Sequence, residues 1–358
     1  MCMPQPKVLA ATSLSYVLVI LDTSIVNVAL APIATALHSN TSALQWVVSA
    51  YTLTFGCLLL AGGAMADRFG ARRLYMTGLL VFTLASLLCG VASNMSLLVA
   101  ARVLQGVGAA LLVPASLALI NQAYAGNPAG RTTAISLWAG CGGIAMAAGP
   151  LVGGVLIEML GWRSIFLVNL PLGLIAVGLS ARLAASAIQP RAAGWLRLTV
   201  QLFGSRVFSL CVAVSLLSAL LLYGLMFVLS LYFQRTLGLS PLRTGVAFLP
   251  LTVLVSIGSL MAGEFVRAFG SRWLISGALM LYVTGFGLLL MGGTTPDYAL
   301  IVVPMPLIGL AAGLITPAAT AALMNAVPPG QAGIAAGTLN TARQIGAALG
   351  VALAGALL

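Results

Sequence analysis

The chain alternates long apolar segments with short polar segments along its whole length. Because about 20 apolar residues in a helix cross the roughly 30 Å hydrocarbon core of a bilayer, each long segment is predicted to be a transmembrane helix. The apolar residues run continuously instead of alternating with a period of two, which favours helices over the strands of a membrane barrel. The pattern therefore predicts an all-α, multi-pass membrane protein with about 11 transmembrane helices. The predicted spans are 8–33, 44–65, 74–93, 96–121, 133–157, 163–184, 207–232, 244–266, 273–292, 298–324 and 333–358.

The composition agrees with a membrane protein, because 61% of the residues are hydrophobic and only 6% are charged. Soluble domains carry about a quarter charged residues. The net charge of +11 could indicate nucleic-acid binding, but the basic residues lie in the short segments between apolar spans, so a lipid bilayer is the expected partner and nucleic acid is not. The sequence shows no catalytic constellation, no cysteine pair at metal-ligand spacing and no phosphate-binding glycine loop, so we expect no enzyme activity, no cofactor and no metal site.

The basic residues also predict the orientation. With the N-terminus in the cytoplasm, 11 of the 16 Lys and Arg residues fall on the cytoplasmic side, three on the outer side and two within spans. Cytoplasmic loops of membrane proteins carry an excess of Lys and Arg, so we expect a protein of the cytoplasmic (inner) membrane with its N-terminus inside. The predicted cytoplasmic set is Lys7, Arg68, Arg72, Arg73, Arg131, Arg182, Arg191, Arg197, Arg206, Arg267 and Arg272.

A polar connector at 185–206 divides the chain into an N-terminal bundle of six helices at 1–184 and a C-terminal bundle of about five at 207–358. The two parts resemble each other, since 66–74 recurs as 266–274 at an offset of 200. A parallel repeat of this kind is typical of transporters whose two bundles rock around a central site. By this symmetry the second bundle is one helix short at its end. The alternative is chance similarity between helices rich in Gly and Ala.

Asp22 is the only acidic residue deep inside a predicted span. A carboxylate there costs about 2.5–3.5 kcal/mol on insertion scales, so a functional role is the default interpretation. On a helical wheel Asp22 shares a face with Tyr16 and Asn27, and this face is expected to meet a polar interior. The alternative is a carboxyl group that bonds a neighbouring helix for structure alone.

Arg102 lies in the fourth predicted span, with Gln105 on the same face. An Arg side chain is long enough to approach Asp22, and a pair of this kind that separates during a conformational change would act as a proton switch. A fixed ion pair between two helices is the alternative.

The segment 62–73 (GGAMADRFGARR) predicts a tight turn between the second and third helices. Gly63 would permit close helix approach and Gly70 a sharp turn. Asp67 could face a helix N-terminus, where a carboxylate is favoured by roughly 0.3–1 kcal/mol. Arg68, Arg72 and Arg73 would hold the loop at the inner face, which by itself is also what an ordinary positive-inside turn would do.

The fifth span carries Gly149, Pro150, Gly153 and Gly154, which predict a kink and a smooth packing surface. Residues 145, 149 and 153 are four apart and are expected to form one ridge against which a neighbouring backbone packs closely. Tyr16, Tyr51 and Arg343 are further candidates for lining a central cavity.

Several motifs occur in one order along nearly the whole chain. They are LDTSIVNVALAPIA (21–34), QWVVSAYTL (45–53), GGAMADRFGARR (62–73), ARVLQGVGAALLVP (101–114), AAGPLVGGVL (147–156), WRSIFLVNLPLG (162–173) and GTLNTARQIGAALGVAL (337–353). Together they resemble the major facilitator superfamily, and specifically the drug:proton antiporters of the EmrB/QacA type.

The resemblance implies two pseudo-symmetric bundles and a cavity that opens alternately to each side. It implies proton-driven export of hydrophobic or cationic small molecules, with the substrate and protons as partners and a periplasmic adaptor left open. Asp22 would be the proton or substrate carboxylate and Arg102 the proton-relay residue, with Asn27 and Gln105 beside them.

The resemblance also assigns two groups of moving parts. Gly63, Asp67, Arg68, Gly70 and Arg72 would form a conformational latch, and Gly149, Pro150, Gly153 and Gly154 the antiporter hinge. The branch usually has fourteen helices, so two between the bundles and the last one would be missing here. Two alternatives stay open: an uptake carrier for a small metabolite, and a truncated relative that does not transport.

Overall fold

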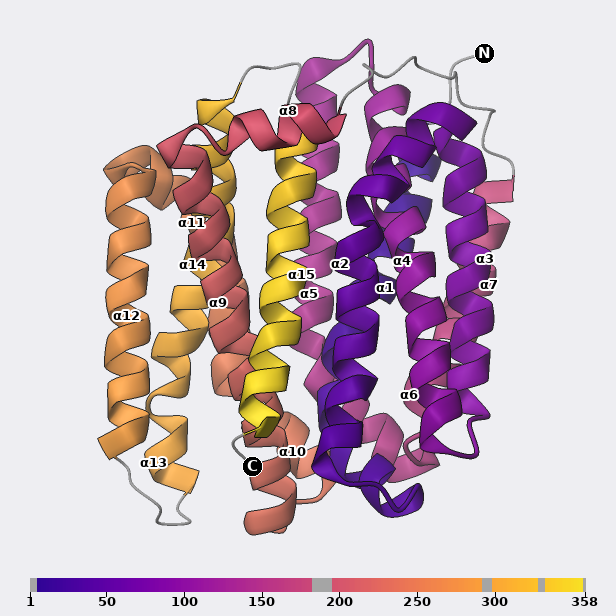
Figure 1. Cartoon of the computed structure of the whole chain (residues 1–358), viewed down its shortest axis with the longest axis vertical. Coiled ribbons are helices and arrows are strands. Elements are labelled where there is room, and N and C mark those ends of the chain that lie inside the picture. Colours follow the sequence, from indigo (N-terminus) through magenta and orange to yellow (C-terminus); the bar gives the residue numbers. More distant parts are fainter. Residues whose placement is uncertain (1–4, 182–194, 292–297, 328–331, 357–358) are drawn as a thin grey trace.

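The computed structural model describes residues 5–181, 195–291, 298–327 and 332–356, and every regular element in these ranges is a helix (Figure 1). The elements are α1 (Gln5–Ala36), α2 (Thr41–Phe69), α3 (Ala71–Gly90), α4 (Met95–Ala123), α5 (Pro128–Leu160), α6 (Ser164–Leu167), α7 (Asn169–Ala181), α8 (Trp195–Leu202), α9 (Arg206–Leu231), the π-helix η1 (Tyr232–Thr236), α10 (Pro241–Ala247), α11 (Leu249–Phe269), α12 (Ser271–Met291), α13 (Tyr298–Val302), α14 (Met305–Ala326) and α15 (Ala332–Ala356).

The long helices run side by side and define two faces, which we name after short helices that lie on them. The α8 side carries α8, the start of α1 and the turn between α2 and α3 (Figure 1). The α10 side carries α10, the connection between α1 and α2, and the end of α15. The basic residues gather on the α8 side as the sequence predicts, whereas Arg163, Arg235 and Arg243 lie on the α10 side. Two of the predicted set, Arg182 and Arg191, fall outside the described residues.

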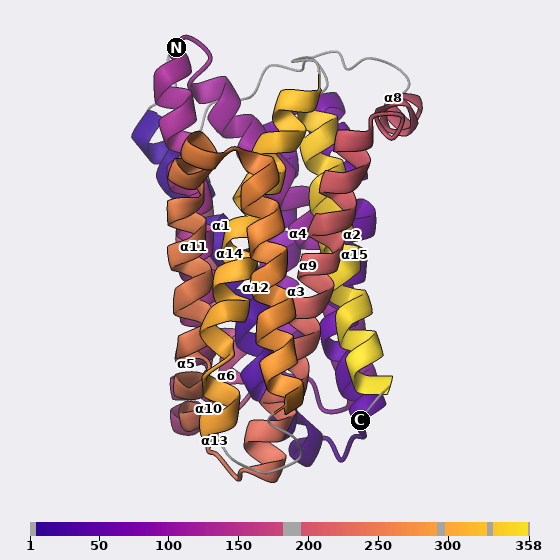
Figure 2. The same ribbon diagram turned by 90° about the vertical axis from the view of Figure 1, so that its left-hand side faces the viewer.

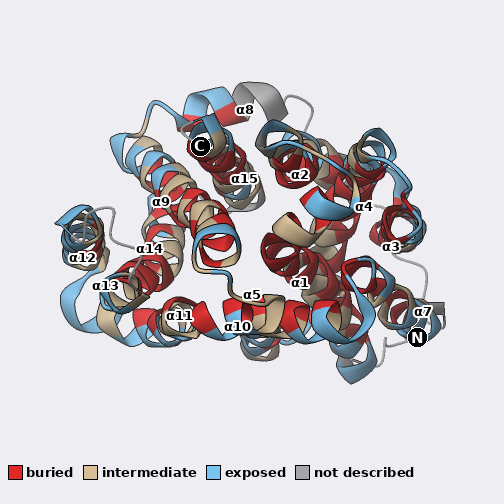
Figure 3. Ribbon diagram, turned by 90° about the horizontal axis from the view of Figure 1, so that it is seen from below, coloured by how far each residue is buried: buried red, intermediate tan, exposed pale blue. Residues whose placement is uncertain are grey.

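The helices have the length and composition of membrane spans. Within the described ranges, nine helices are long and apolar enough to cross a membrane. The remaining two predicted spans are α6 with α7, whose apolar part is shorter, and α15, where Asn340, Arg343 and Gln344 interrupt the apolar sequence. Large apolar side chains such as Leu260 and Leu290 stay exposed. Exposed positions lie mostly on the outward faces of the helices, which is the surface that lipid would cover (Figure 3). The chain is therefore an all-helical, multi-pass membrane protein.

Three predicted spans are broken where a single helix was expected. Each of 163–184, 244–266 and 298–324 forms two helices. The breaks lie just before Pro171 and Pro250 and next to Pro304. Proline lacks an amide hydrogen and its ring crowds the preceding turn, which explains the interruptions. The predicted connector 185–206 is also partly helical, since it contains α8, while 182–194 lies outside the described residues.

The internal repeat is visible in matching backbone details. Gly70 ends α2 with φ 93° and Gly270 ends α11 with φ 78°, and each N–H bonds the carbonyl oxygen four residues earlier. A Cβ added at Gly106 of α4 would lie 2.7 Å from the Tyr51 carbonyl oxygen of α2. The equivalent Cβ at Gly309 of α14 would meet the Leu251 carbonyl oxygen of α11. Tyr51 and Leu251 differ by the same offset of 200, so α4 packs on α2 as α14 packs on α11.

The first half (α1–α7) and the second half (α9–α15) meet along two seams. Seen along the helices in Figure 3, α2 and α15 close one edge, α5 with α10 and α11 closes the other, and α1 and α9 lie between them. The side view in Figure 2 also places α2 and α15 at one edge and α5, α10 and α11 at the other. On the α10 side one apolar cluster contains residues of both halves, including Ile25 of α1, Phe227 of α9 and Val351 of α15. On the α8 side the halves keep separate clusters, one around Leu119 and one around Leu339. The two halves thus share an apolar core on the α10 side and have separate cores on the α8 side.

Candidate functional site

The carboxylate of Asp22 lies in a fully buried hydrogen-bond cluster inside the first half. Its Oδ2 accepts the ion-pair hydrogen bond of Arg102 Nη1, which reaches across from α4. Its Oδ1 accepts from Gln105 Nε2 at 2.9 Å and from Asn169 Nδ2 at 3.0 Å. Arg102 thus reaches Asp22, as the length of its side chain allows, and Gln105 from the same face of α4 joins it. A buried carboxylate with three donors is compensated, which is the condition for keeping a charge away from water.

The guanidinium of Arg102 is held from several directions at once. Its Nη1 also donates to Gln105 Oε1 at 2.7 Å, and its Nε donates to the Val47 carbonyl oxygen at 2.9 Å. Its central carbon lies 4.2 Å from the centre of the Tyr51 ring, which adds a cation–π contact. Tyr51 is completely buried, and its hydroxyl donates to the Val19 carbonyl oxygen of α1 at 3.3 Å. The ring therefore lies between α1, α2 and α4 and packs on Arg102.

Two members of the cluster, Asn169 and Ser86, escaped the sequence analysis. Asn169 opens α7, directly after the break that Pro171 imposes, and its Nδ2 lies 3.3 Å from Ser86 Oγ as well. Gln105 Nε2 donates to the same Ser86 oxygen at 2.8 Å. Asn169 lies within the segment 162–173 that carries the family resemblance, and it is a polar residue between apolar neighbours just before a proline. That signal could have identified it.

Asn27 lies apart from the Asp22 cluster. Its Nδ2 donates to backbone oxygens of its own helix, at 3.1 Å from Ser24. Its carbonyl oxygen accepts from Ser230 of α9, and Gln234 Nε2 donates to the Val28 carbonyl at 3.0 Å. Asn27 therefore marks a contact between the halves on the α10 side, five residues beyond Asp22.

The glycines of α5 pack against two different neighbours. A Cβ at Gly149 would meet Ser24, and one at Gly153 would lie 2.7 Å from Ile25 Cγ1, so both face α1 of the same half. The expected ridge therefore packs on a neighbouring helix inside the first half. Gly154 instead faces the second half, because the next residue along a helix points about 100° further round. Its Cβ would lie 2.7 Å from the Pro241 carbonyl oxygen of α10.

The carbonyl oxygen of Pro150 extends the contact of α5 with the second half. A Cβ at Gly245 of α10 would collide with this oxygen. Beyond it on the α10 side, Glu158 Oε2 accepts from Ser240 Oγ at 2.8 Å. One face of α5 therefore binds the first half while another face binds the second.

The turn at 62–73 differs in one residue from the prediction. A Cβ at Gly62 would collide with the Ala110 carbonyl oxygen of α4, whereas one at Gly63 would make only ordinary contact with Pro114 at 3.8 Å. Gly62 is therefore the close-approach residue, since neighbouring positions point in different directions. Gly70 makes the sharp turn as expected. Arg68 is exposed with its charge 5.2 Å from the Phe69 ring centre, Arg72 is half-buried, and the Asp67 side chain lies outside the described part.

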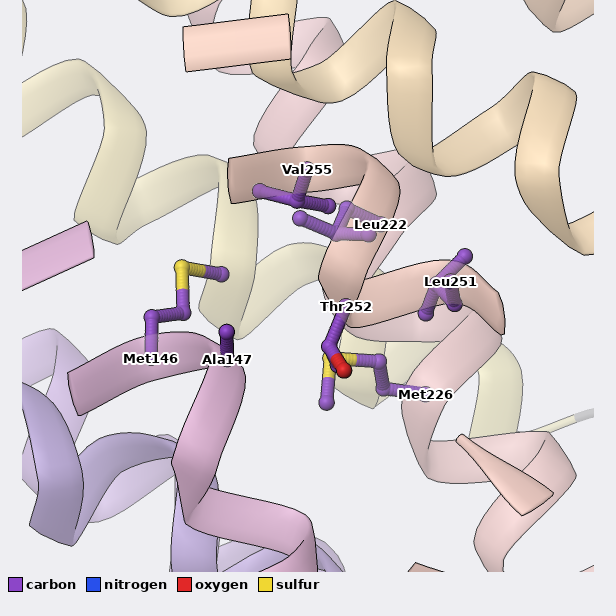
Figure 4. Close-up of a pocket in the computed structure, with 7 residues that line it drawn as sticks. All are labelled: Met146, Ala147, Leu222, Met226, Leu251, Thr252 and Val255. Carbon is purple, nitrogen blue, oxygen red and sulfur yellow. The ribbon is translucent and has the colours of Figure 1, made fainter. Parts of the chain in front are cut away.

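The other two cavity candidates, Tyr16 and Arg343, are both half-buried. The Tyr16 ring stacks on Trp138 of α5 within the first half, with ring centres 3.8 Å apart, whereas Arg343 Nη1 on α15 lies 3.5 Å from Asn340 Oδ1. A small apolar pocket lies between the two halves, where α5 faces α9 and α11 (Figure 4). It is lined by Met146, Ala147, Leu222, Met226, Leu251, Thr252 and Val255.

Comparison with known proteins identifies relatives over the full length of this architecture. The family described as Major Facilitator Superfamily matches residues 12–351. A methylenomycin A resistance protein of Bacillus subtilis (strain 168) is 35% identical, covering 98% of this chain and 87% of that protein. The puromycin resistance protein pur8 of Streptomyces alboniger is 36% identical, covering 94% and 78%.

Solved structures share the fold at lower sequence identity. A D-xylose-proton symporter superposes with a TM-score of 0.78 at 17% identity, covering 98% of this chain and 89% of that one. A bacterial homologue of the human lysosomal transporter Spinster, in an inward-facing and unoccupied conformation, gives 0.77 at 19% identity, covering 97% and 81%. The arrangement of two matching halves is therefore that of these transporters.

Proposed function

Because the chain belongs to the Major Facilitator Superfamily, a family of transporters, we propose that it is a secondary active exporter of drug-like small molecules. The resistance functions in the names of its relatives support export as the direction of transport. We place it among the drug:proton antiporters, in which protons moving inward drive the substrate outward. The motifs quoted from the sequence support this branch.

The observation that carries the proton-coupled mechanism is the Asp22–Arg102 pair. Both groups are buried, and the carboxylate is the proton acceptor available within the span. Protonation of Asp22 would remove one charge of the pair and free Arg102, whose remaining partners are Gln105 and the Val47 carbonyl. Breaking a buried ion pair in this way leaves an uncompensated charge, so the helices must rearrange. A proton moving through 100 mV supplies about 2.3 kcal/mol for that cycle.

The position of Asp22 favours a proton role over contact with the substrate. All its donors come from the first half: Arg102 and Gln105 from α4, and Asn169 from α7. The substrate would instead bind between the halves, next to Tyr16, Arg343 and the apolar pocket (Figure 4). Proton and substrate are then coupled through movement of α1, which carries both Asp22 and Tyr16.

The two seams support alternating access. The halves are joined on the α10 side and have separate cores on the α8 side, so the central space would open to the α8 side. We assign the α8 side to the cytoplasm on the basis of its basic residues, which gives an inner-membrane protein with a cytoplasmic N-terminus. Gly154 and Pro150 would then act in the hinge, and the turn at Gly70 in the latch.

An accumulation assay tests the proposal. Bacteria without their own drug exporters would express the full chain, and intracellular puromycin would be measured with and without a proton uncoupler. We expect lower accumulation than in cells expressing Asp22→Asn, and loss of the difference when the uncoupler is added. Equal accumulation in both strains, with the protein present in the membrane, would contradict export. Proton coupling is tested separately in everted membrane vesicles with an acidic lumen. Adding puromycin should release protons from the lumen of these vesicles.

A further inference from the structure

Asn169 has one buried polar atom that the Asp22 cluster does not use. Its Nδ2 donates to Asp22 Oδ1 at 3.0 Å and to Ser86 Oγ at 3.3 Å. Its Oδ1, in contrast, is buried and has no hydrogen-bond partner in the described part of the chain. The residue is only 1% exposed, so bulk water does not reach this oxygen. A buried acceptor without a donor is costly, and it calls for a functional explanation.

The Asp22 carboxylate has one oxygen that can take up a proton without opposing a fixed charge. Its Oδ2 faces Arg102 Nη1, which only donates hydrogen bonds. Its Oδ1 faces two amide nitrogens, Nε2 of Gln105 at 2.9 Å and Nδ2 of Asn169. A proton on Oδ1 would therefore point at donors, so one of the two amides must turn over and present its oxygen instead.

Gln105 cannot turn over without losing other bonds. Its Oε1 accepts from Arg102 Nη1 at 2.7 Å and from the Cys89 sulfur at 3.6 Å. Exchanging the positions of its oxygen and nitrogen would set an NH₂ group against the guanidinium, which has no acceptor. The orientation of the Gln105 amide is thus fixed for as long as Arg102 stays beside it.

Asn169 can turn over with fewer losses. Rotation of its amide by about 180°, between the two broad wells of this torsion, brings Oδ1 to face Asp22 and Ser86. The oxygen has no partner to lose, and the NH₂ group takes its place, so one unpartnered group replaces another. The Ser86 hydroxyl, which donates to the Phe82 carbonyl oxygen at 2.8 Å, can rotate to donate to the turned amide. The turned amide then accepts the acid proton of Asp22.

We propose that Asn169 is a positioning residue that follows the proton on Asp22: its amide donates to the carboxylate, and it turns over to accept from the carboxylic acid. One proton binds Oδ1, and no covalent bond of Asn169 changes. The α7 helix stays bound to α1 in both protonation states, while Arg102 of α4 loses its anionic partner. The movement that follows proton uptake is thus directed to α4. This role rests on the proposed proton binding at Asp22 and specifies how the site responds to it.

Infrared difference spectra of the purified full chain in detergent, recorded between alkaline and acidic pH, test the turn. Asparagine would be labelled with ¹³C at Cγ, which distinguishes its side-chain carbonyl bands from those of unlabelled groups. A carbonyl stretch falls in frequency when its oxygen gains a hydrogen bond, so we expect one asparagine band to shift down on acidification. The band of protonated Asp22 should appear at the same time, and both changes should be absent from Asp22→Asn.

Two further variants identify the amide. Asn169→Ala should remove the asparagine shift and move the acid band of Asp22 to higher frequency, because the acid proton loses its acceptor. Asn27→Ala is the matched control, since Asn27 Oδ1 is also buried without a partner in the described ranges, whereas its Nδ2 donates to its own helix. This variant should leave both bands as they are in the parent.

The outcomes separate the role of Asn169 from the export function. An unchanged acid band in Asn169→Ala, or a parent spectrum without the asparagine shift or without the acid band of Asp22, would overturn the proposal. Failure of Asn169→Ala to fold would show in gel filtration. The parent and Asp22→Asn then decide, since an asparagine shift that persists in Asp22→Asn also overturns it. If both bands behave as expected but puromycin accumulation is unaffected by the protein, export fails and the role of Asn169 stands.

Discussion

Asn169 Nδ2 lies 3.0 Å from Oδ1 of Asp22, although the two residues are 147 positions apart in the sequence. The helix breaks between α6 and α7, and Asn169 is the first residue of α7, at the same depth as the carboxylate. A movement of α7 would therefore change the hydrogen bonding of the Asp22 carboxylate. The break before Pro171 thus sets the position of a side chain in the cluster.

Replacing Asn169 with Ala should change how efflux depends on pH. The variant removes one of three donors to the Asp22 carboxylate, and a lost hydrogen bond to a charged group costs about 1.5–3 kcal/mol. Efflux measured across a range of external pH should show a displaced profile. Asn121→Ala, at an exposed position near the end of α4, is the matched control. A uniform loss at every pH would indicate that Asn169 serves stability alone.

The Asp22–Arg102 pair should show a non-additive effect on stability. Asp22→Asn leaves Arg102 buried without its partner, and breaking a buried pair costs about 3–5 kcal/mol. The double variant Asp22→Asn with Arg102→Gln removes both charges and should recover part of the thermal stability in detergent, while proton-driven efflux stays lost in both. Additive stability losses would mean that the two groups do not interact as the geometry indicates. Unchanged proton-driven efflux in Asp22→Asn would remove Asp22 from the mechanism.

Adding bulk at Gly154 should loosen the contact between the halves on the α10 side. Leu at this position would push against the Pro241 carbonyl oxygen of α10, and overpacking typically costs about 1–3 kcal/mol. In a chain without its native cysteines, Thr244→Cys reports the contact, because Thr244 is buried in α10. Thiol labelling should be faster with Gly154→Leu than with Gly143→Leu, a control on the same helix with open space around it. Equal labelling rates would place the moving contact elsewhere.

Asp67→Asn should lower efflux without preventing substrate binding. Asp67 lies in the last turn of α2 on the α8 side, away from the central site, so its expected role is in the conformational cycle. Puromycin binding to the purified protein and puromycin efflux from cells would be measured together. Glu264→Gln, an exposed carboxylate on the same side, is the control for charge. Binding that falls as far as efflux would argue against a gating role.

Sequence reasoning located the spans and the buried charges because both follow from physical rules that act along the chain. Apolar length is set by the bilayer, and a carboxylate inside a span is costly wherever it lies. The same rules identified Gly70, since a turn between two helices at a positive φ favours glycine. These features depend on local sequence, and the structure agrees with them.

Features that depend on neighbours were harder to predict. Gly62 and Gly63 are adjacent in sequence, and only the rotation of α2 against α4 decides which one meets the Ala110 carbonyl oxygen. Tyr51 could have faced a cavity or Arg102, and the choice depends on how three helices pack. Asn169 carries no charge and lies far along the chain, so its distance from Asp22 is visible only once α7 is placed. Which of these residues face one another is determined by the angles at which the helices pack.

The confinement of every Asp22 donor to the first half has a consequence for how such a protein can change over time. Substitutions on α9 and α15 leave the hydrogen bonds of the carboxylate cluster on α1, α3, α4 and α7 intact. In the proposed mechanism, the range of exported compounds can therefore change by mutation of the second half, while the proton-binding cluster of the first half stays the same.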